Sequence, residues 1–387
     1  MIQIPNFPSV DAVVDALKPS YPIYCLRPQE LKAQATYFLD HFPGRVLYAV
    51  KCNPHVIVLQ ALFDAGIRHF DTASLQEIAL VREHFPQADC YFMHPVKPRA
   101  AIQTAHDVYR IDHYVIDHQK ELDKIVEETG AGDARVVLVR IITPSFDAQY
   151  KLSDKFGIAG DDAVALLRAV HAAGFQTGIA FHVGSQCREP EAFRAGIEAA
   201  FDIIETADVP VHYLDVGGGF PARYEADNPP PLADYIDIIN EVADRSRLRG
   251  DCVLMCEPGR SMVASGCSLL AQVQLRKADD LYINDGIYQS LSETLVANLQ
   301  LPARAVNPQK SFSEATNAFR ILGPTCDCTD MLPHPLILPE NIDEGDWIEL
   351  GQIGAYSNAA ATHFNGFFTE TFVTVDAPPL LPVYDLE

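Results

Sequence analysis

A lysine ends an apolar, β-type run in the stretch "VLYAVKCNPHV", which covers residues 46–56. Most lysines keep a protein soluble, but a lysine amine that spends time neutral can form a Schiff base with an aldehyde. Lys51 is a candidate for this chemistry because further polar residues also stand at the ends of apolar runs. They are Asp71, Arg140, His182, the triple glycine Gly217, Gly218 and Gly219, and Glu257.

The segments "GGGF" and "EPGR" supply the remaining parts of one chemistry. Glycine has no Cβ, so the backbone N–H groups of "GGGF" can come close to a phosphate. In "EPGR", Glu257 offers a carboxylate to a ring nitrogen and Arg260 offers a cation to the phosphate, with Gly259 between them. A lysine, a phosphate cradle and a ring carboxylate are what pyridoxal phosphate requires. The sequence therefore predicts this cofactor.

These residues need a scaffold that brings the ends of several strands together. From about residue 46 to 260, eight short β-type runs alternate with longer amphipathic ones, which predicts a (β/α)8 barrel. The runs are "RVLYAVKC", "RHFDTAS", "CYFMHPV", "HYVID", "RVVLVRII", "TGIAFHV", "VHYLDVGG" and "CVLMCEPG". A doubly wound sheet is the rival, but its usual Gly-x-Gly-x-x-Gly opening after the first strand is missing.

After about Gly266 the pattern changes to strands joined by turns, as in "CSLLAQVQLRK", "DLYIND", "AFRILGPT" and "DWIELGQIG". This pattern predicts a mostly β domain, either a β-barrel or a sandwich. We therefore expect a cofactor-binding barrel over residues 26–265. Residues 1–25 and 266–387 are expected to form the β-domain.

Composition excludes several classes of function. The net charge of -23 argues against nucleic-acid binding. The first twenty residues lack a basic stretch followed by an apolar one, and no apolar run reaches the length of a membrane span. The nine cysteines are scattered and show no zinc-finger spacing, so we expect reduced thiols, no metal site and a cytoplasmic protein.

Eight motifs in order resemble the fold-type III, pyridoxal-phosphate-dependent basic amino-acid decarboxylases, most closely their ornithine decarboxylase group. The motifs are "YAVKCN", "FDTASLQEI", "FHVGSQC", "LDVGGGFP", "CEPGR", "NDGIYQSL", "GPTCDCTD" and "GAYSNAAATHFNGF". The family fold is a (β/α)8 barrel plus a β-domain in a homodimer, which agrees with the strand count.

The resemblance implies a role for each matching residue. Lys51 would be the Schiff-base lysine, Glu257 the partner of the ring nitrogen and His182 a support for one ring face. The phosphate would be held by Ser185, Gly217, Gly218, Gly219, Arg260 and Tyr356. Asp71, Glu77 and Arg140 match polar residues around the lysine and the ring.

The resemblance also implies the reaction, which is decarboxylation of L-ornithine to putrescine through an external aldimine, in polyamine biosynthesis. Cys326 would help to protonate Cα after decarboxylation. Asp285 and Asp327 would bind the distal ammonium, because an ammonium removed from water needs paired anions. In the family the "TCD" segment comes from the partner subunit, so we expect active sites shared across a homodimer interface.

Other functions fit parts of the pattern. A lysine or dual lysine/ornithine decarboxylase differs by one methylene of substrate, which is worth only ~1–3 kcal/mol of discrimination. A carboxynorspermidine decarboxylase matches these motifs less well. From a different class, a catalytically silent protein could regulate a decarboxylase, although Lys51 and Cys326 are both retained. One departure from the family is Cys328, where a small or hydroxylated residue is expected.

Overall fold

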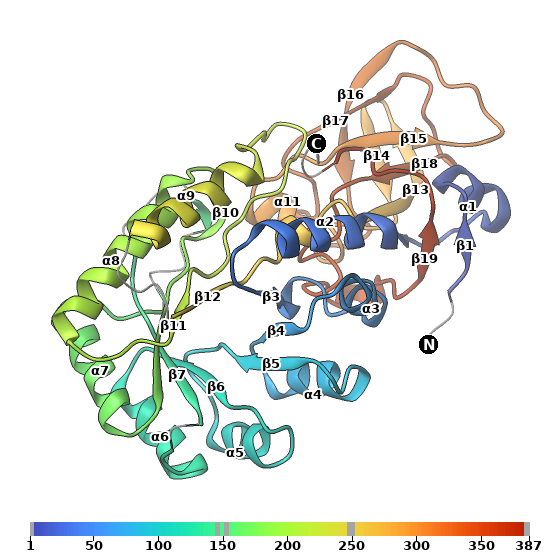
Figure 1. Cartoon of the computed structure of the whole chain (residues 1–387). Coiled ribbons are helices and arrows are strands. Elements are labelled where there is room, and N and C mark those ends of the chain that lie inside the picture. The colour runs from blue at the N-terminus through green and yellow to red at the C-terminus, as the bar shows by residue number, and fades with distance from the viewer. Residues whose placement is uncertain (1–3, 133, 144–147, 151–154, 246–251, 383–387) are drawn as a thin grey trace. The chain divides into compact units, whose positions relative to one another are not determined.

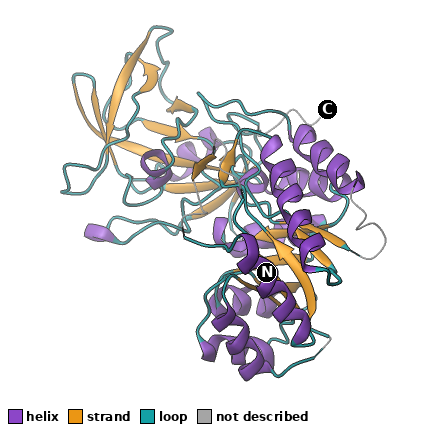
Figure 2. Cartoon of the chain, turned by 90° about the vertical axis from the view of Figure 1, so that its left-hand side faces the viewer, coloured by secondary structure: helices purple, strands orange, loops and turns teal. Residues whose placement is uncertain are grey.

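The computed structural model describes residues 4–132, 134–143, 148–150, 155–245 and 252–382 of the 387-residue chain. It divides into two compact units. Residues 35–221 and 230–259 form one, which we call the barrel unit; residues 1–34, 222–229 and 260–387 form the other, the β-rich unit. Helices surround the strands of the barrel unit, whereas the β-rich unit consists mainly of strands and loops (Figure 2).

Eight parallel strands close into a barrel, which confirms the predicted (β/α)8 fold (Figure 1). In order around the ring they are β3 (Arg45–Ala49), β4 (His69–Thr72), β5 (Asp89–Phe92), β6 (His113–Ile116), β7 (Val136–Arg140), β9 (Gln176–Ala180), β11 (Tyr213–Asp215) and β12 (Val253–Cys256). Each matches one of the eight apolar runs read from the sequence.

Helices connect consecutive strands, as parallel strand pairs require. They are α3 (Val56–Ala65), α4 (Leu75–His84), α5 (Arg99–Asp107), α6 (Gln119–Thr129), α7 (Gly160–Ala172), α8 (Glu191–Ala207) and α9 (Leu232–Arg245). A further helix, α2 (Pro28–His41), precedes β3 and crosses the boundary at residue 34. The short 3-10 helix η1 (Val50–Cys52) follows β3, and a two-stranded ribbon joins β8 (Ala148–Tyr150) to β10 (Ser185–Cys187).

The interior of the barrel is filled by side chains of alternate strand residues, as small barrels require. This cluster consists of Leu47, Tyr91, Met93, Val115, Val136, Leu138, Ala180 and Met255, with Tyr213 and Val253 packed against it. Because side chains alternate along a strand, these residues identify which positions point inward.

The β-rich unit is built on a nine-stranded sheet. Its longest strand, β13 (Cys267–Lys277), pairs antiparallel with β2 (Ile23–Leu26), β14 (Asp280–Ile283) and β18 (Trp347–Leu350). The remaining strands are β1 (Asn6–Phe7), β15 (Ala303–Val306), β16 (Thr316–Leu322), β17 (Leu336–Pro339) and β19 (Phe372–Val375). Helices α1 (Val10–Leu17), α10 (Arg260–Val263) and α11 (Ser292–Val296) and the 3-10 helix η2 (Phe364–Gly366) complete the unit.

The two units have different bounds from the domains expected from sequence. Residues 26–34 belong to the β-rich unit, where the Arg27 N–H donates to the Gly266 carbonyl at 2.8 Å and continues the pairing of β2 with β13. Residues 222–229 also belong to it, because the Glu225 N–H donates to the Gln300 carbonyl at 3.0 Å. These backbone pairings link segments far apart in sequence, which local patterns do not reveal.

Among the described residues, no helix has the length and apolar character needed to cross a membrane. Within the same part of the chain, no three His, Cys, Asp or Glu side chains are grouped so that they could hold a metal ion.

Candidate active site

The inward-pointing residues at the carboxyl ends of the barrel strands are polar. Arg140 lies two residues after the core residue Leu138, and His182 lies two residues after Ala180. Asp71, Asp215 and Glu257 also point inward, because each lies two residues after an inward-pointing residue: His69, Tyr213 and Met255. The alternation that fills the barrel with apolar side chains therefore directs five polar side chains to its carboxyl end, and Lys51 joins them through its contact with Asp71.

Lys51 and Asp71 form an ion pair at this end of the barrel. The Lys51 Nζ lies 2.8 Å from Asp71 Oδ2. Lys51 stands in η1, just beyond the end of β3, and not in the strand itself. Its side chain is 42% exposed, while that of Asp71 is 1% exposed. A buried carboxylate thus holds an amine that solutes can still reach.

His182 is neutral and has a defined orientation. Its Nδ1 accepts a hydrogen bond from the Gly184 N–H at 3.0 Å, which leaves the proton on Nε2. Burial, and then the charges of Arg140 and Lys51, hold the pKa of His182 well below its usual range. A neutral ring suits a contact with another ring face better than a charged one would.

The glycine turn after β11 admits no side chains. A Cβ on Gly217 would lie 2.0 Å from the Phe181 carbonyl oxygen, and one on Gly219 would lie 2.5 Å from that of Gly184. Both glycines also have positive φ, +69° and +115°. A Cβ on Gly218 would meet the Glu257 carbonyl oxygen at 2.6 Å. The turn therefore exposes backbone, as a phosphate cradle requires.

Glu257 follows β12 directly, and a second acid that the sequence analysis did not name, Asp215, acts on its charge. Burial, followed by the charges of Asp215 and Asp71, raises the pKa of Glu257 well above its usual range. Burial also raises the pKa of Asp215 to about 7. Asp215 precedes the glycine turn in "LDVGGGF", and its inward parity with Tyr213 is the signal that could have identified it.

Ser185 and Gly259 are two further predicted site residues in the barrel unit. Ser185 begins β10, and its partner in the two-stranded ribbon is Tyr150. A Cβ on Gly259 would lie 3.1 Å from the Cβ of Cys52 and 3.3 Å from that of Ala49, so the chain passes close to the lysine turn there. Both residues therefore lie in segments that follow barrel strands.

Glu77 serves the helix α4. Its Oε2 accepts from the Ala73 N–H at 2.7 Å, while the Oγ of Ser74 accepts from the Glu77 N–H at 3.3 Å. This arrangement resembles a capping box and satisfies N–H groups at the start of the helix. Glu77 therefore supports the segment after Asp71 and lies near the Lys51 and Asp71 charges.

In the β-rich unit the structure brings Arg260 and Tyr356 together. The guanidinium carbon lies 5.1 Å from the centre of the Tyr356 ring, within cation–π range. The same guanidinium lies 2.5 Å from the Glu293 carboxylate and donates to the Tyr224 hydroxyl at 2.9 Å. Glu293 and Tyr224 were not expected from sequence, because nothing in the local pattern joins them to "EPGR".

Asp285 is fully buried and holds its own turn together. Its Oδ1 accepts from the N–H groups of Gly286 at 2.8 Å and Ser290 at 3.0 Å, and its Oδ2 accepts from the Ser290 hydroxyl at 2.8 Å. Burial raises its pKa to about 7. The carboxylate has no exposed oxygen, so this placement favours a positioning role over the direct substrate contact predicted from sequence.

Asp327 and Cys326 lie on a loop between β16 and β17 and are accessible. Asp327 accepts from the Thr329 N–H and hydroxyl and from the Tyr288 hydroxyl, each at 2.8 Å. These hydrogen bonds lower its pKa, so it is an anion at neutral pH. The Cys326 thiol is exposed and lies 3.2 Å from Asn365 Oδ1.

Asp330 ties this loop to the turn that contains Asp285. Its Oδ1 accepts from the Ile287 N–H and its Oδ2 from the Thr325 N–H, both at 3.0 Å. A Cβ on Gly286 or Gly323 would lie 2.2 Å from Asp330 Oδ1, so both must be glycine for the carboxylate to fit. The two family motifs "NDGIYQSL" and "GPTCDCTD" are thus one hydrogen-bonded cluster.

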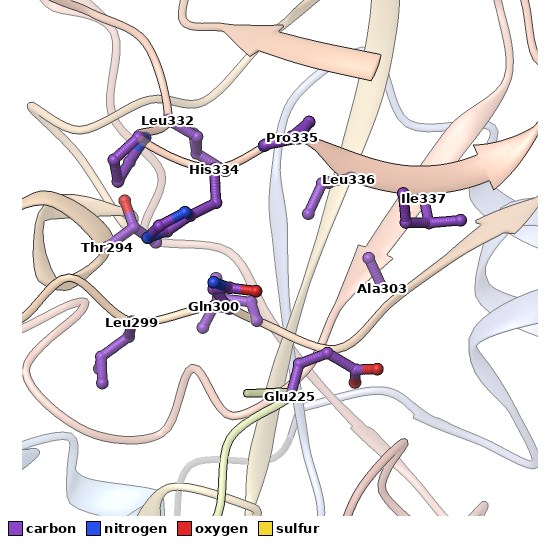
Figure 3. Close-up of a pocket in the computed structure, with 12 residues that line it drawn as sticks. Glu225, Thr294, Leu299, Gln300, Ala303, Leu332, His334, Pro335, Leu336 and Ile337 are labelled. Carbon is purple, nitrogen blue, oxygen red and sulfur yellow. The ribbon is translucent and has the colours of Figure 1, made fainter. Parts of the chain in front are cut away.

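A separate pocket of about 120 Å³ lies within the β-rich unit. Figure 3 shows the side chains that line it, among them Glu225, Thr294, Gln300 and His334. None of the predicted site residues lines this pocket.

Comparisons with known proteins agree with this chemistry. Residues 29–264 match the family described as pyridoxal-dependent decarboxylase, pyridoxal binding domain. The chain is 32% identical to a lysine/ornithine decarboxylase of Selenomonas ruminantium, over 87% of this chain and 86% of that protein. It is also 32% identical to antizyme inhibitor 2 of Xenopus laevis, over 85% of this chain and 75% of that protein.

Among solved structures, the arginine decarboxylase of Paramecium bursaria Chlorella virus, bound to agmatine, superposes with a TM-score of 0.83. It is 26% identical and covers 95% of this chain and 98% of its own. The family match spans more than half of the chain and includes Lys51, Asp71 and Glu257. The chain therefore belongs to the fold-type III pyridoxal-dependent decarboxylases of basic amino acids, enzymes whose cofactor is pyridoxal phosphate.

Proposed function

We propose that the chain decarboxylates L-ornithine to putrescine for polyamine biosynthesis, as a cytoplasmic homodimer. The observation that carries the proposal is the reachable Lys51 amine, held by buried Asp71 at the carboxyl end of the barrel. The partly exposed anion Asp327 supports a substrate with a distal cation. Relatives named for lysine and ornithine support the choice of a diamino acid.

The residues of the barrel end fit the cofactor. The glycine turn that admits no Cβ would cradle its phosphate, together with Ser185. Arg260 of the β-rich unit, whose guanidinium lies over the Tyr356 ring, would supply positive charge to a phosphate, and Gly259 would let the chain pass close to the lysine turn. Lys51 would hold the aldehyde carbon, Glu257 the ring nitrogen and His182 one face of the ring. When bound, pyridoxal phosphate supplies a ring that accepts the electrons left by the departing carboxylate.

Asp71 governs the proton and the position of Lys51. Its Oδ2 accepts a hydrogen bond from the amine, so it holds Nζ at one place in the barrel mouth. Arg140 adds a second cation near Glu257 and His182. These charges favour an ionised Glu257, which a protonated ring nitrogen would need as its partner.

Cys326 would donate a proton from its Sγ to the substrate Cα after carbon dioxide leaves. Its thiol is exposed, and the Asn365 side chain, which also accepts from the Cys326 N–H at 3.1 Å, orients the residue. We propose that Cys326 and Asp327 act on the substrate bound by the partner subunit. A monomer would then be nearly inactive.

Substrate choice rests on the cluster around Asp327. Asp327 would bind the distal ammonium directly, and Asp285 would hold the adjoining turn through Ser290 and Gly286. Lysine carries one more methylene than ornithine, so a dual specificity is the second candidate.

The test is carbon dioxide release from ornithine, lysine and arginine by the protein reconstituted with pyridoxal phosphate. We expect the highest kcat/KM for ornithine. A higher kcat/KM for lysine would identify lysine as the preferred substrate, and the proposed decarboxylation chemistry would still hold. No release from any of the three, with cofactor bound, would favour a silent regulator instead, the role that the name of the Xenopus relative suggests.

Lys51→Ala tests the cofactor attachment itself. Borohydride should trap the cofactor on the wild-type protein but not on this variant, which should still fold. Lys120→Ala is the matched control, because Lys120 is exposed on α6 and has no place in the site. Trapping that persists in Lys51→Ala would refute the assignment of Lys51.

A further inference from the structure

Asp215 is a buried carboxyl group at the carboxyl end of the barrel that no predicted role uses. It ends β11, where it is fully buried and lies opposite Met255 of β12 in the parallel register. Glu257 is two residues beyond Met255, so both carboxyl groups point inward from adjacent strands. The role inferred for Asp215 rests on the proposed role of Glu257 as partner of the ring nitrogen.

Hydrogen bonds join Asp215 to the glycine turn, and the glycine turn to the backbone of Glu257. Asp215 Oδ1 accepts from the Gly217 N–H at 2.8 Å. The carbonyl of Gly217 in turn accepts from the Glu257 N–H at 2.8 Å. Asp215 Oδ2 is buried and has no hydrogen-bond partner among the described residues, and the carboxyl group of Glu257 is a neighbour that acts on its pKa. The Asp215 side chain thus holds the glycine turn through one oxygen and leaves the other, buried oxygen available to Glu257.

Ionising two adjacent buried carboxyl groups at once is unfavourable, because the two negative charges repel each other away from water. One of the two groups therefore holds a proton. Burial raises the pKa of both carboxyl groups. A bound pyridinium nitrogen favours the ionised form of Glu257, which leaves the proton on Asp215. The other titratable or charged groups that act on this pair are Asp71 of β4, Arg140 of β7, Lys51 of η1 and Cys256 of β12.

We infer that Asp215 is a positioning residue: its protonated carboxyl group donates a hydrogen bond to the Glu257 carboxylate while its Oδ1 accepts from the Gly217 N–H. Asp215 then fixes the direction in which Glu257 presents its charge. It also keeps the glycine turn at a set distance from that charge, because the same side chain contacts both.

Asp215→Asn and Asp215→Ala separate this role from others. The asparagine amide can still donate to Glu257 and its oxygen can still accept from Gly217, whereas alanine can do neither. Titration of each folded protein with pyridoxal phosphate, followed by fluorescence, gives the cofactor Kd. We expect the Asn variant to stay within about twofold of wild type and the Ala variant to bind about tenfold more weakly, because a hydrogen bond to a charged group is lost.

Asp117→Asn and Asp117→Ala form the matched control. Asp117 also follows a barrel strand, and its Oδ2 accepts from the Gly157 N–H at 3.0 Å. We expect an unchanged cofactor Kd in both control variants. Equal weakening by Asn and Ala at position 215, or no weakening by either, would overturn the inference.

Infrared spectroscopy of the holoenzyme gives a second measurement that does not need the Ala variant to fold. Below about pH 7, the wild-type spectrum minus that of Asp215→Asn should contain the carbonyl band of a protonated carboxyl group. Absence of this band would show that Asp215 holds no proton. Wild-type protein that binds no cofactor would instead refute the proposed function, so the two failures are distinct.

Discussion

Gly217→Ala tests whether the turn after β11 holds the cofactor phosphate. Gly217 has φ +69°, and an added Cβ would lie 2.0 Å from the Phe181 carbonyl oxygen. The left-handed conformation costs an alanine about 1–2 kcal/mol. Relief of the overlap, which involves backbone on both sides, adds roughly 1–3 kcal/mol. The turn must move away from Phe181, and its N–H groups move with it.

Gly174→Ala is the control: it introduces the same left-handed backbone strain as Gly217→Ala but no overlap with a neighbouring atom. Gly174 has φ +83°, and nothing lies within 4 Å of the position that an added Cβ would take. The free energy of unfolding of Gly174→Ala should therefore fall only by the cost of the left-handed conformation, about 1–2 kcal/mol. Urea midpoints and thermal midpoints of the two variants measure the stability difference, and a fluorescence titration measures the Kd for pyridoxal phosphate.

We expect Gly217→Ala to be the less stable variant and to bind the cofactor at least tenfold more weakly than Gly174→Ala. Both should fold, because domain stabilities of about 5–15 kcal/mol exceed these costs. If Gly217→Ala bound the cofactor as tightly as Gly174→Ala, the turn would not be the phosphate site.

Three further predictions concern the β-rich unit. Cys326→Ala should lower kcat for decarboxylation at least tenfold, while Cys328→Ala, also at an exposed thiol, should leave kcat within about twofold; equal effects in a steady-state assay would contradict the assignment. Asp327→Asn should raise KM for ornithine at least tenfold with little change in the thermal midpoint, since it removes an accessible charge; an unchanged KM would exclude the contact. Burial raises the pKa of Asp285 to about 7 from 3.8, so the folded protein binds its proton over a range in which the unfolded chain has released it. Stability from this group is therefore present at low pH and lost as pH rises from about 4 to about 7, and urea midpoints of Asp285→Asn should fall less steeply over that range than those of wild type.

The resemblance of eight motifs in order indicates the family, and the strand count indicates the barrel independently. Each of the eight apolar runs forms a barrel strand. A short apolar run bounded by polar residues is typical of a buried strand when such runs alternate with amphipathic, helical ones. Strand ends in a parallel barrel share one rim, which is why Lys51 and Glu257 could be assigned to one place although they are far apart in sequence.

The carboxyl pair marks the limit of what the sequence could predict about the site. Asp215 stands within the motif "LDVGGGFP", but the sequence assigns it no role, because its relation to Glu257 depends on the register of β11 with β12. The register pairs two segments far apart in the chain, so the pattern of either segment alone does not show which residues lie opposite each other.

The sequence by itself predicted the barrel and the cofactor and singled out Lys51, since these depend on residue types, periodicity and order along the chain. Tertiary structure alone decided which acids are exposed and which are buried. Asp327 and Asp285 looked equivalent as carboxylates in matching motifs, yet one is a partly exposed anion and the other is enclosed by Gly286 and Ser290. Burial and hydrogen-bond partners set the charge of a carboxyl group, and both arise only when distant segments pack together.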